Sequence, residues 1–176
     1  MEILTQRLRL RRLVPADVTA AYVGWLNDAE VKRFLETRRS MQDEASVRDF
    51  VAQKAASANE FLFGIFLLDG GRHIGNIKVG PIHDHHDLAD VSLLIGERDC
   101  WGKGFAAEAI AAVSRHAFDV LGVVKLSASM YAENEGSRHA FLKAGYVEEG
   151  RRRSHYELDG RRSDLVELGA LPGEIA

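Results

Sequence analysis

The spacing of apolar residues along the chain predicts a mixture of strands and helices. Leu8 and Leu10 share one face of an alternating segment, as a half-buried strand requires. The continuous apolar run 61–68 is typical of a strand that is buried on both faces, and Asp69-Gly70-Gly71 after it predicts a hairpin. The expected strands cover residues 2–11, 61–68, 72–79, 89–96, 123–131, a segment that begins at Tyr146, and 164–171.

Helical periodicity occurs at five places. Pro15 suits the first turn of one helix, and Gly122 is a good terminator of another. A third helix has Ser40 or Asp43 as its N-cap. The side chains of this helix expected to face the core are Val47, Phe50, Val51 and Ala55. The expected helices cover residues 15–26, 29–36, 40–57, 103–121 and 135–144.

The order of these elements predicts the fold class. Helices and strands mingle without strict alternation, which favours an α/β protein of the α+β kind, with helices packed on a mixed sheet. The chain has 176 residues, enough for one domain with a full core, so we expect a single domain over residues 1–176.

Composition narrows the class of function. Apolar residues make up 46% of the chain and charged residues 28%, which is typical of a globular protein, and the net charge of −3 gives no basis for nucleic-acid binding. No apolar run approaches the roughly 20 residues of a membrane helix, and no signal-peptide pattern is present. The single cysteine, Cys100, excludes an internal disulfide and suits the cytoplasm, where we expect the protein to act.

The segment between the strand 89–96 and the helix 103–121 has the chemistry of an anion site. It reads Trp101-Gly102-Lys103-Gly104-Phe105-Ala106. The first turn of a helix has unpaired N–H groups and the positive end of the helix dipole, and glycines let a ligand approach the backbone closely. The segment therefore predicts a site for phosphate.

This segment, extended to Ala109, resembles the acetyl-CoA loop of the GNAT superfamily of N-acetyltransferases, and most of all the branch that acetylates the N-termini of bacterial ribosomal proteins. Three other parts of the chain are similar to this branch: its opening strand at Thr5–Arg11, its second cofactor motif at Asn134–Ser137 with Lys143–Tyr146, and its final hairpin at Asp159-Gly160 with Asp164. The resemblance implies a GNAT-like fold. Its mixed, mostly antiparallel sheet would have six to seven strands, helices on both faces, and a split between the two central strands.

The resemblance also implies acetyl-CoA as the co-substrate, with its pyrophosphate on the glycine loop. Backbone N–H groups would point at the phosphates, and Lys103 would add charge. The strand that ends at Gly96 would pair with the pantetheine arm, and an N–H near Leu94 would meet the acetyl carbonyl. Trp101 stands where the superfamily usually has Gln or Arg, as it often does in this branch. The predicted cofactor-binding residues are Leu94, Ile95, Trp101, Gly102, Lys103, Gly104, Phe105, Ala106, Asn134 and Arg138.

Acetyl transfer to an amine requires a proton to leave the amine and another to reach the thiolate. Asp90 is the first candidate base, directly or through water, because the histone-acetylating branch has a Glu on this strand; a solvated strand end is the other interpretation. Many family members use a Tyr acid where this chain has Phe141, so the resemblance implies Ser137 instead, unless Ser137 only caps the helix. Asn134 resembles a residue that contacts pantetheine and is also a candidate N-cap. The predicted catalytic residues are Asp90, Ser137 and Asn134.

The acceptor is less explicit in the sequence. The resemblance places the segment Trp25–Arg39 and the hairpin near Glu157 beside the cofactor slot. Arg38 and Arg39 could bind a phosphate or be a solvated helix end. The segment His73–Ile82 is similar to one in acetyltransferases of surface-sugar pathways. An N-terminal α-amine, with a pKa of about 7.7–8.0, needs only a weak base, whereas a polyamine would be a problem. We expect the primary amine of a protein N-terminus or of a small molecule such as a nucleotide-linked amino sugar.

Alternatives remain at this level. A CoA-binding module without turnover, acting as a sensor or partner, is the main one, and the absent Tyr supports it slightly. His83, His85 and His86 lack the spacing of a zinc site, so we expect no metal. Cys100 lacks a nearby His base and is expected to be a bystander. A homodimer is common for such folds and stays open.

Overall fold

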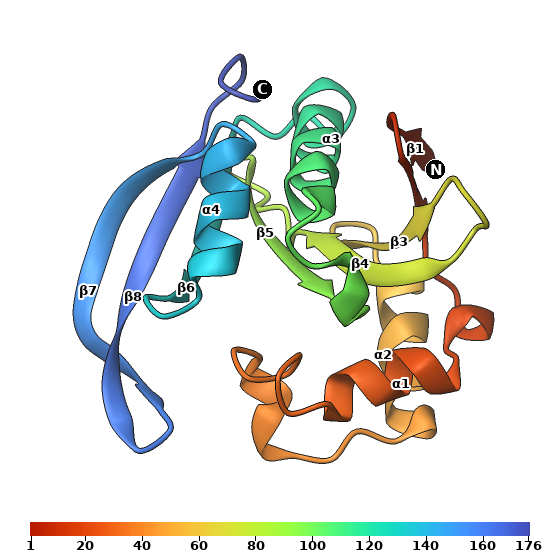
Figure 1. The fold of residues 1–176 in the computed structure, drawn as a ribbon. Coiled ribbons are helices and arrows are strands. Elements are labelled where there is room, and N and C mark those ends of the chain that lie inside the picture. The colour runs from red at the N-terminus through yellow and green to blue at the C-terminus, as the bar shows by residue number, and fades with distance from the viewer.

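The computed structural model describes all residues, 1–176, and contains eight strands and four α-helices (Figure 1). The strands are β1 (Glu2–Leu4), β2 (Leu8–Arg12), β3 (Phe61–Leu67), β4 (His73–Val79), β5 (Leu88–Ile95), β6 (Lys125–Tyr131), β7 (Val147–Leu158) and β8 (Arg161–Ala170). The helices are α1 (Ala20–Asn27), α2 (Glu44–Ala56), α3 (Phe105–Asp119) and α4 (Glu135–Lys143), with 3-10 turns at Pro15–Asp17, Glu36–Arg39 and Arg98–Cys100. None of the helices is both long and apolar enough to cross a membrane.

All eight strands form one sheet in the order β1-β2-β3-β4-β5-β6-β8-β7. Every neighbouring pair is antiparallel except β5 and β6, so the expected mixed, mostly antiparallel sheet is confirmed. The strand count of six to seven was too low by one. The predicted strand 2–11 folds back on itself at Thr5, whose N–H bonds to the Leu8 carbonyl at 2.9 Å, and so becomes β1 and β2.

The sheet is split between β5 and β6, as expected. These parallel strands pair only at their beginnings, where Leu88, Ala89 and Asp90 lie opposite the first residues of β6. Beyond Asp90 the two strands separate, and residues 91–95 pair only with β4. One edge of β5 is therefore free of a neighbouring strand at its C-terminal half.

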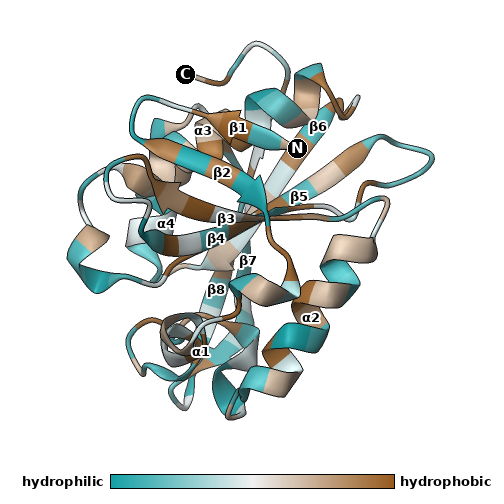
Figure 2. Ribbon diagram, turned by 90° about the vertical axis from the view of Figure 1, so that its right-hand side faces the viewer, coloured by the Kyte–Doolittle hydropathy of each residue, from teal (hydrophilic) through white to brown (hydrophobic).

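Helices cover both faces of the sheet. Phe63 and Ile65 of β3 face the larger core, which includes Ile110 of α3. Leu62 of the same strand faces a smaller core, which includes Val51 of α2. Burial on both faces explains why β3 is apolar throughout, and Figure 2 shows the hydrophobic colour along the central strands.

Two helical predictions were wrong. The segment 29–36 forms turns instead of a helix. The Asp28 carboxylate accepts bonds from the N–H groups of Glu30 and Val31 at 2.9 and 3.0 Å, as a helix N-cap does. The backbone bonds that follow, such as that from Arg33 N to the Glu30 carbonyl at 3.4 Å, mostly span three residues and do not continue as an α-helix. Phe50 is 43% exposed instead of facing the core, since Val47 and Val51 form the buried stripe of α2.

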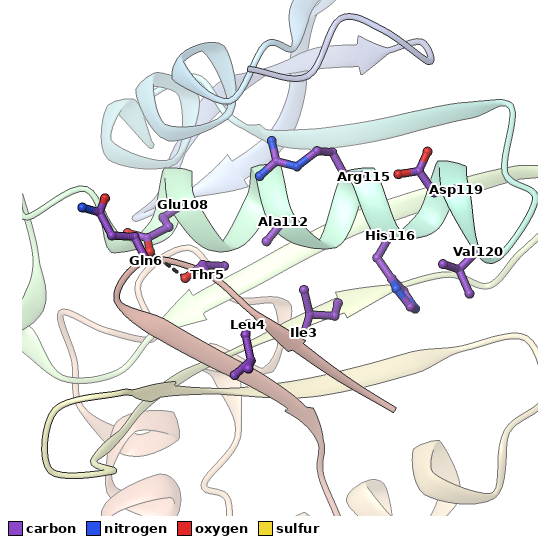
Figure 3. A pocket seen from close by; sticks show the side chains of 10 residues that line it. All are labelled: Ile3, Leu4, Thr5, Gln6, Glu108, Ala112, Arg115, His116, Asp119 and Val120. Carbon is purple, nitrogen blue, oxygen red and sulfur yellow. Dashed lines mark hydrogen bonds between the residues drawn. The ribbon is translucent and has the colours of Figure 1, made fainter.

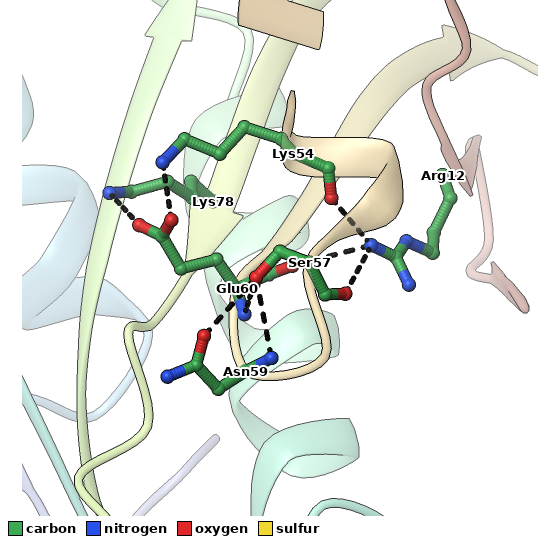
Figure 4. A network of polar contacts seen from close by, with 6 residues as sticks. All are labelled: Arg12, Lys54, Ser57, Asn59, Glu60 and Lys78. Atoms are coloured by element: carbon green, nitrogen blue, oxygen red, sulfur yellow. Dashed lines mark hydrogen bonds and ion pairs between the residues drawn. The ribbon is translucent and has the colours of Figure 1, made fainter. Parts of the chain in front are cut away.

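A polar network fastens the end of α2 to the sheet (Figure 4). Arg12 of β2 donates to four carbonyls at and after the helix end, including those of Lys54 at 2.8 Å and Glu60 at 3.3 Å. The Glu60 carboxylate pairs with Lys54 and, at 3.3 Å, with Lys78 of β4. The Lys54 bond is the main reason that the pKa of Glu60 is lowered. The α2 layer is thereby fixed to both β2 and β4.

Candidate functional site

The glycine loop owes its shape to two residues in the left-handed conformation. Gly102 has a φ of 72° and Gly104, the N-cap of α3, has a φ of 81°. Other residues are strained at such angles, so both positions favour glycine. The left-handed Gly104 also explains why α3 begins at Phe105 and not at Lys103.

Six consecutive N–H groups in this loop have no acceptor in the protein. The N–H groups of Gly102, Lys103 and Gly104 make no hydrogen bond. Those of residues 105–107 lie in the first turn of α3, where N–H groups have no intrahelical acceptor. The first partnered amide is that of Glu108, which bonds to the Gly104 carbonyl at 3.1 Å. A row of free amides at a helix N-terminus is a binding site for an anion.

Two lysines add positive charge here. Lys103 is exposed and makes no ion pair, and neither does Lys143 at the end of α4. A methyl group added at Gly104 would lie 3.9 Å from the Lys143 ammonium nitrogen. Lys143 thus comes from a distant part of the sequence to the same loop. The resemblance had placed Lys143 in the second cofactor motif, but no local signal indicated this contact.

Arg7 and Glu108 hold the loop in place, a contact that the sequence interpretation missed. The Glu108 carboxylate accepts bonds from Thr5 Oγ1 at 2.6 Å and from Arg7 Nε at 2.7 Å (Figure 3 draws the Thr5 bond). Arg7 also donates to the Lys103 carbonyl at 3.0 Å and lies over the Phe105 ring at 4.5 Å. Burial raises the pKa of Glu108, but the bonds from Thr5 and Arg7 outweigh it and lower the pKa overall.

The hollow in Figure 3 is separate from the loop and the gap in the sheet. It measures about 520 Å³ and runs along the outer side of α3 beside β1. Glu108 forms one end and Val120 the other, and none of the predicted site residues lines it.

The free edge of β5 presents backbone groups to the gap. The bonds from Gly80 N to Asp90 O and from Gly96 N to Ile74 O fix the register with β4. Since bonded pairs alternate along antiparallel strands, the amide of Leu94 is used in pairing with β4. The N–H groups that point into the gap are those of Leu93 and Ile95, and the predicted oxyanion donor near Leu94 is narrowed to these two neighbours.

Trp101 contacts this same edge. Its indole N–H donates to the Ile95 carbonyl at 2.8 Å, while 43% of the residue remains exposed. Trp25 of α1 holds the start of the loop from the other side, because its indole packs on Gly96 and bonds to Glu97 at 2.9 Å. Both tryptophans therefore hold the connection where it leaves β5.

Asp90 lies at the point where β5 and β6 separate. Its carboxylate is exposed and makes no hydrogen bond or ion pair within the protein. Ser92 follows on the same face of the strand and is also exposed. This geometry leaves both interpretations of Asp90 in place, a base at the gap or a solvated strand end.

The start of α4 carries the second group of predicted residues. Asn134 is the N-cap, since its Oδ1 accepts a bond from the Ser137 N–H at 3.3 Å. Capping thus falls to Asn134, and the Ser137 hydroxyl has no partner in the protein and remains partly exposed. Helices α4 and α3 lie side by side and run in the same direction (Figure 1), so Ser137 and the glycine loop belong to neighbouring helix N-terminal regions.

Two neighbouring residues have structural partners. Arg138 pairs with Glu148 at 2.8 Å, and this bond raises the pKa of Arg138. Phe141 is buried with its ring edge against Tyr146, whose hydroxyl bonds to Ser114 at 2.9 Å. Burial raises the pKa of Tyr146 strongly, so neither aromatic residue can supply a proton to the site.

The structure brings together the two segments that were expected to flank the acceptor. Arg38 donates to the Tyr131 hydroxyl at 3.0 Å and to the Glu157 carbonyl at 2.9 Å, which joins segment 29–39 to β6 and to the β7–β8 hairpin. Tyr131 donates in turn to Glu36 at 2.6 Å. A pocket of about 350 Å³ lies between the segment and the hairpin.

The other candidate residues lack the surroundings of a catalytic or metal-binding site. Cys100 is buried, and burial raises the pKa of its thiol, which argues against a nucleophile. His83, His85 and His86 are exposed on a loop. No group of three or more His, Cys, Asp or Glu side chains is arranged to hold a metal ion.

Comparison with known proteins agrees with this site. The family model described as an acetyltransferase (GNAT) domain matches residues 7–147. The uncharacterized N-acetyltransferase YoaA of Bacillus subtilis (strain 168) is 30% identical over 163 residues, which cover 91% of this chain and 90% of YoaA.

Solved structures share the fold. Spermidine N-acetyltransferase of Vibrio cholerae, in complex with CoA and spermine, has a TM-score of 0.85 at 21% identity over 97% of this chain and 98% of that chain. Mycobacterium smegmatis RimJ, in complex with CoA-disulfide, has a TM-score of 0.80 at 20% identity over 95% and 83% of the two chains. The family model and YoaA carry the assignment beyond the fold: the chain belongs to the GNAT family of acetyltransferases and is an N-acetyltransferase that uses acetyl-CoA.

Proposed function

We propose that the protein transfers the acetyl group to a primary amine by direct attack in the gap between β5 and β6. The observation that carries this proposal is that two sets of unpaired backbone donors occur on one strand-to-helix connection: those of the free edge of β5, and the six amides of the glycine loop. Such an arrangement suits a ligand with a polyanionic end and an extended, amide-containing arm.

The loop amides and Lys103 would hold the pyrophosphate, and the open edge of β5 would pair with the pantetheine arm. The N–H groups of Leu93 and Ile95 are then the nearest backbone donors for the thioester oxygen, where negative charge develops during attack. Asn134 fixes the turn that carries Ser137.

Protons and bonds balance in a simple scheme. The amine nitrogen bonds to the acetyl carbon as the carbon–sulfur bond breaks. The Ser137 hydroxyl donates its proton to the departing sulfur and regains one from the amine through water. Asp90, unpaired at the mouth of the gap, accepts that proton transiently. An acceptor amine with a pKa near 8 needs no stronger base.

The acceptor remains a choice between a protein N-terminus and a small-molecule amine such as a nucleotide-linked amino sugar. We further propose one domain over residues 1–176, action in the cytoplasm, no role for nucleic acid or membrane, and assembly as a homodimer. The competing proposal is a CoA-binding module without turnover.

Calorimetry with acetyl-CoA, followed by a free-thiol release assay over a panel of peptides, amino sugars and polyamines, tests the proposal. We expect binding and amine-dependent thiol release. Binding without thiol release from any amine would favour the non-catalytic module, and absence of binding would overturn the cofactor site.

A further inference from the structure

We infer that the acceptor amine carries a phosphate group, which binds in the pocket between segment 29–39 and the β7–β8 hairpin. This inference rests on the proposed function, because it names the substrate class of the same transfer site. The pocket of about 350 Å³ lies within the size range of ligand sites. Its lining residues are Ala29, Lys32, Arg33, Arg38, Arg39, Glu157 and Asp159.

The charge of this pocket is opposite to that of the chain. Four cationic and two anionic side chains line it, a formal excess of two positive charges, whereas the whole chain has a net charge of −3. Lys32 makes no ion pair. A local positive excess in a concave surface favours an anionic ligand and opposes a polycation such as a polyamine.

The arginines are oriented and still have donors available. Arg33 pairs with Asp159 at 3.4 Å, and Arg39 pairs with Glu157. Each pair uses one terminal nitrogen of a guanidinium that has five N–H donors, so several donors remain. Two guanidinium groups with an ammonium group beside them match the three oxygens of a phosphate better than the two of a carboxylate.

Arg38 connects this pocket to the gap in the sheet. Its side chain is only 12% exposed and is fixed by bonds to Tyr131 and to the Glu157 carbonyl. Tyr131 ends β6, the strand that borders the gap, and its ring lies 4.9 Å from that of Tyr156. Arg38 and the buried Tyr131 therefore join the phosphate pocket to the strand that borders the site of transfer.

The test compares amines that differ only in phosphate. Binding of glucosamine, glucosamine 6-phosphate and UDP-glucosamine is measured by calorimetry with CoA present, and thiol release is measured with acetyl-CoA. We expect each phosphorylated amine to bind at least about tenfold more tightly than glucosamine. We expect spermidine to bind more weakly than both phosphorylated amines. Preference for glucosamine 6-phosphate would indicate a sugar phosphate, and preference for UDP-glucosamine a nucleotide-linked sugar.

Variants of the lining residues test whether the phosphate binds in this pocket. Lys32→Gln and Arg39→Gln should each weaken binding of the preferred phosphorylated amine about three- to tenfold and leave the affinity for acetyl-CoA unchanged. The matched control is Arg115→Gln on α3, whose side chain bonds only to the Ala176 carbonyl, and it should change neither value.

Equal binding of glucosamine and its phosphorylated forms, or no binding of any of them, would overturn the inference, as would tighter binding of spermidine or of an acidic peptide. Because these binding measurements need no turnover, they can fail while thiol release from other amines still supports the acetyltransferase proposal. Conversely, phosphate-dependent binding without thiol release from any amine would contradict the proposed function alone.

Discussion

The two halves of the site differ in the groups that form them. The half proposed to bind acetyl-CoA consists mainly of backbone: left-handed glycines, six free amides and the open edge of β5. The half proposed to bind the acceptor consists of side chains from segment 29–39 and from the β7–β8 hairpin, joined by Arg38 and two ion pairs.

This difference predicts which side-chain substitutions each half tolerates. A backbone site is insensitive to most side-chain substitutions but depends on the few residues that permit its conformation. A side-chain site changes its ligand with each charge that is replaced. We therefore expect the cofactor half to stay the same among proteins of this fold while the acceptor half sets the substrate.

Substitution of Gly104 should have the largest effect. Gly104→Glu puts a carboxylate and a strained φ where the phosphates should lie, and we expect affinity for acetyl-CoA to fall at least about 100-fold, measured by calorimetry. Gly122→Glu is the matched control, since Gly122 also has a positive φ of 73°, has open space around it, and lies beyond the other end of α3. Unchanged affinity in Gly104→Glu would refute the backbone site.

Ser137→Ala tests the proposed proton donor at the start of α4. We expect kcat to fall roughly 10- to 100-fold while the affinity for acetyl-CoA stays within about twofold, because Asn134 and not Ser137 caps α4. Ser129→Ala, at an exposed position of β6, is the control. Equal losses of kcat and of affinity would mean that Ser137 only contributes to binding.

The contrast between the halves also explains what the sequence could predict. The glycine loop is local, so its residues stand together in the sequence and the motif indicates both conformation and ligand. The continuous apolar run of β3 likewise predicted a strand covered on both faces. The number of strands was missed by one, because only the bonds of Thr5 divide β1 from β2.

Contacts between distant segments could not be predicted in the same way. The contacts of Arg7 with Glu108, of Lys143 with Gly104 and of Trp25 with Gly96 join residues that are 39 to 101 positions apart. No local pattern distinguishes these residues from solvated charges or core aromatics. The choice between Leu94 and its neighbours as amide donors needed the register with β4, which the sequence does not contain.

Arg38→Met would break the acceptor half while sparing the cofactor half. It removes the bonds to Tyr131 and to the Glu157 carbonyl but keeps an apolar side chain of similar length, so the hairpin should detach from segment 29–39. We expect KM for the amine to rise about tenfold with acetyl-CoA affinity unchanged. Arg12→Met, which removes the ties at the end of α2, is the contrasting variant: it should lower the melting temperature without a selective rise in KM. A matching loss of acetyl-CoA affinity in Arg38→Met would show that the two halves are not independent.

The smallest effect concerns the pH dependence of the loop anchor. The pKa of Glu108 is lowered in the folded protein, so its contribution to stability is complete above the ordinary value of 4.5 and is lost as the pH falls through the lower, folded value. The melting temperature of the wild type should therefore fall between pH 7 and pH 3. The fall should be smaller in Glu108→Gln, because the variant has no carboxylate to protonate at this position. Glu44→Gln is the control, since Glu44 is exposed and pairs only with Arg48 one turn along α2, a contact of little value at the surface. If the two variants follow the same pH curve, the anchor that fixes the cofactor half does not depend on the charge of Glu108.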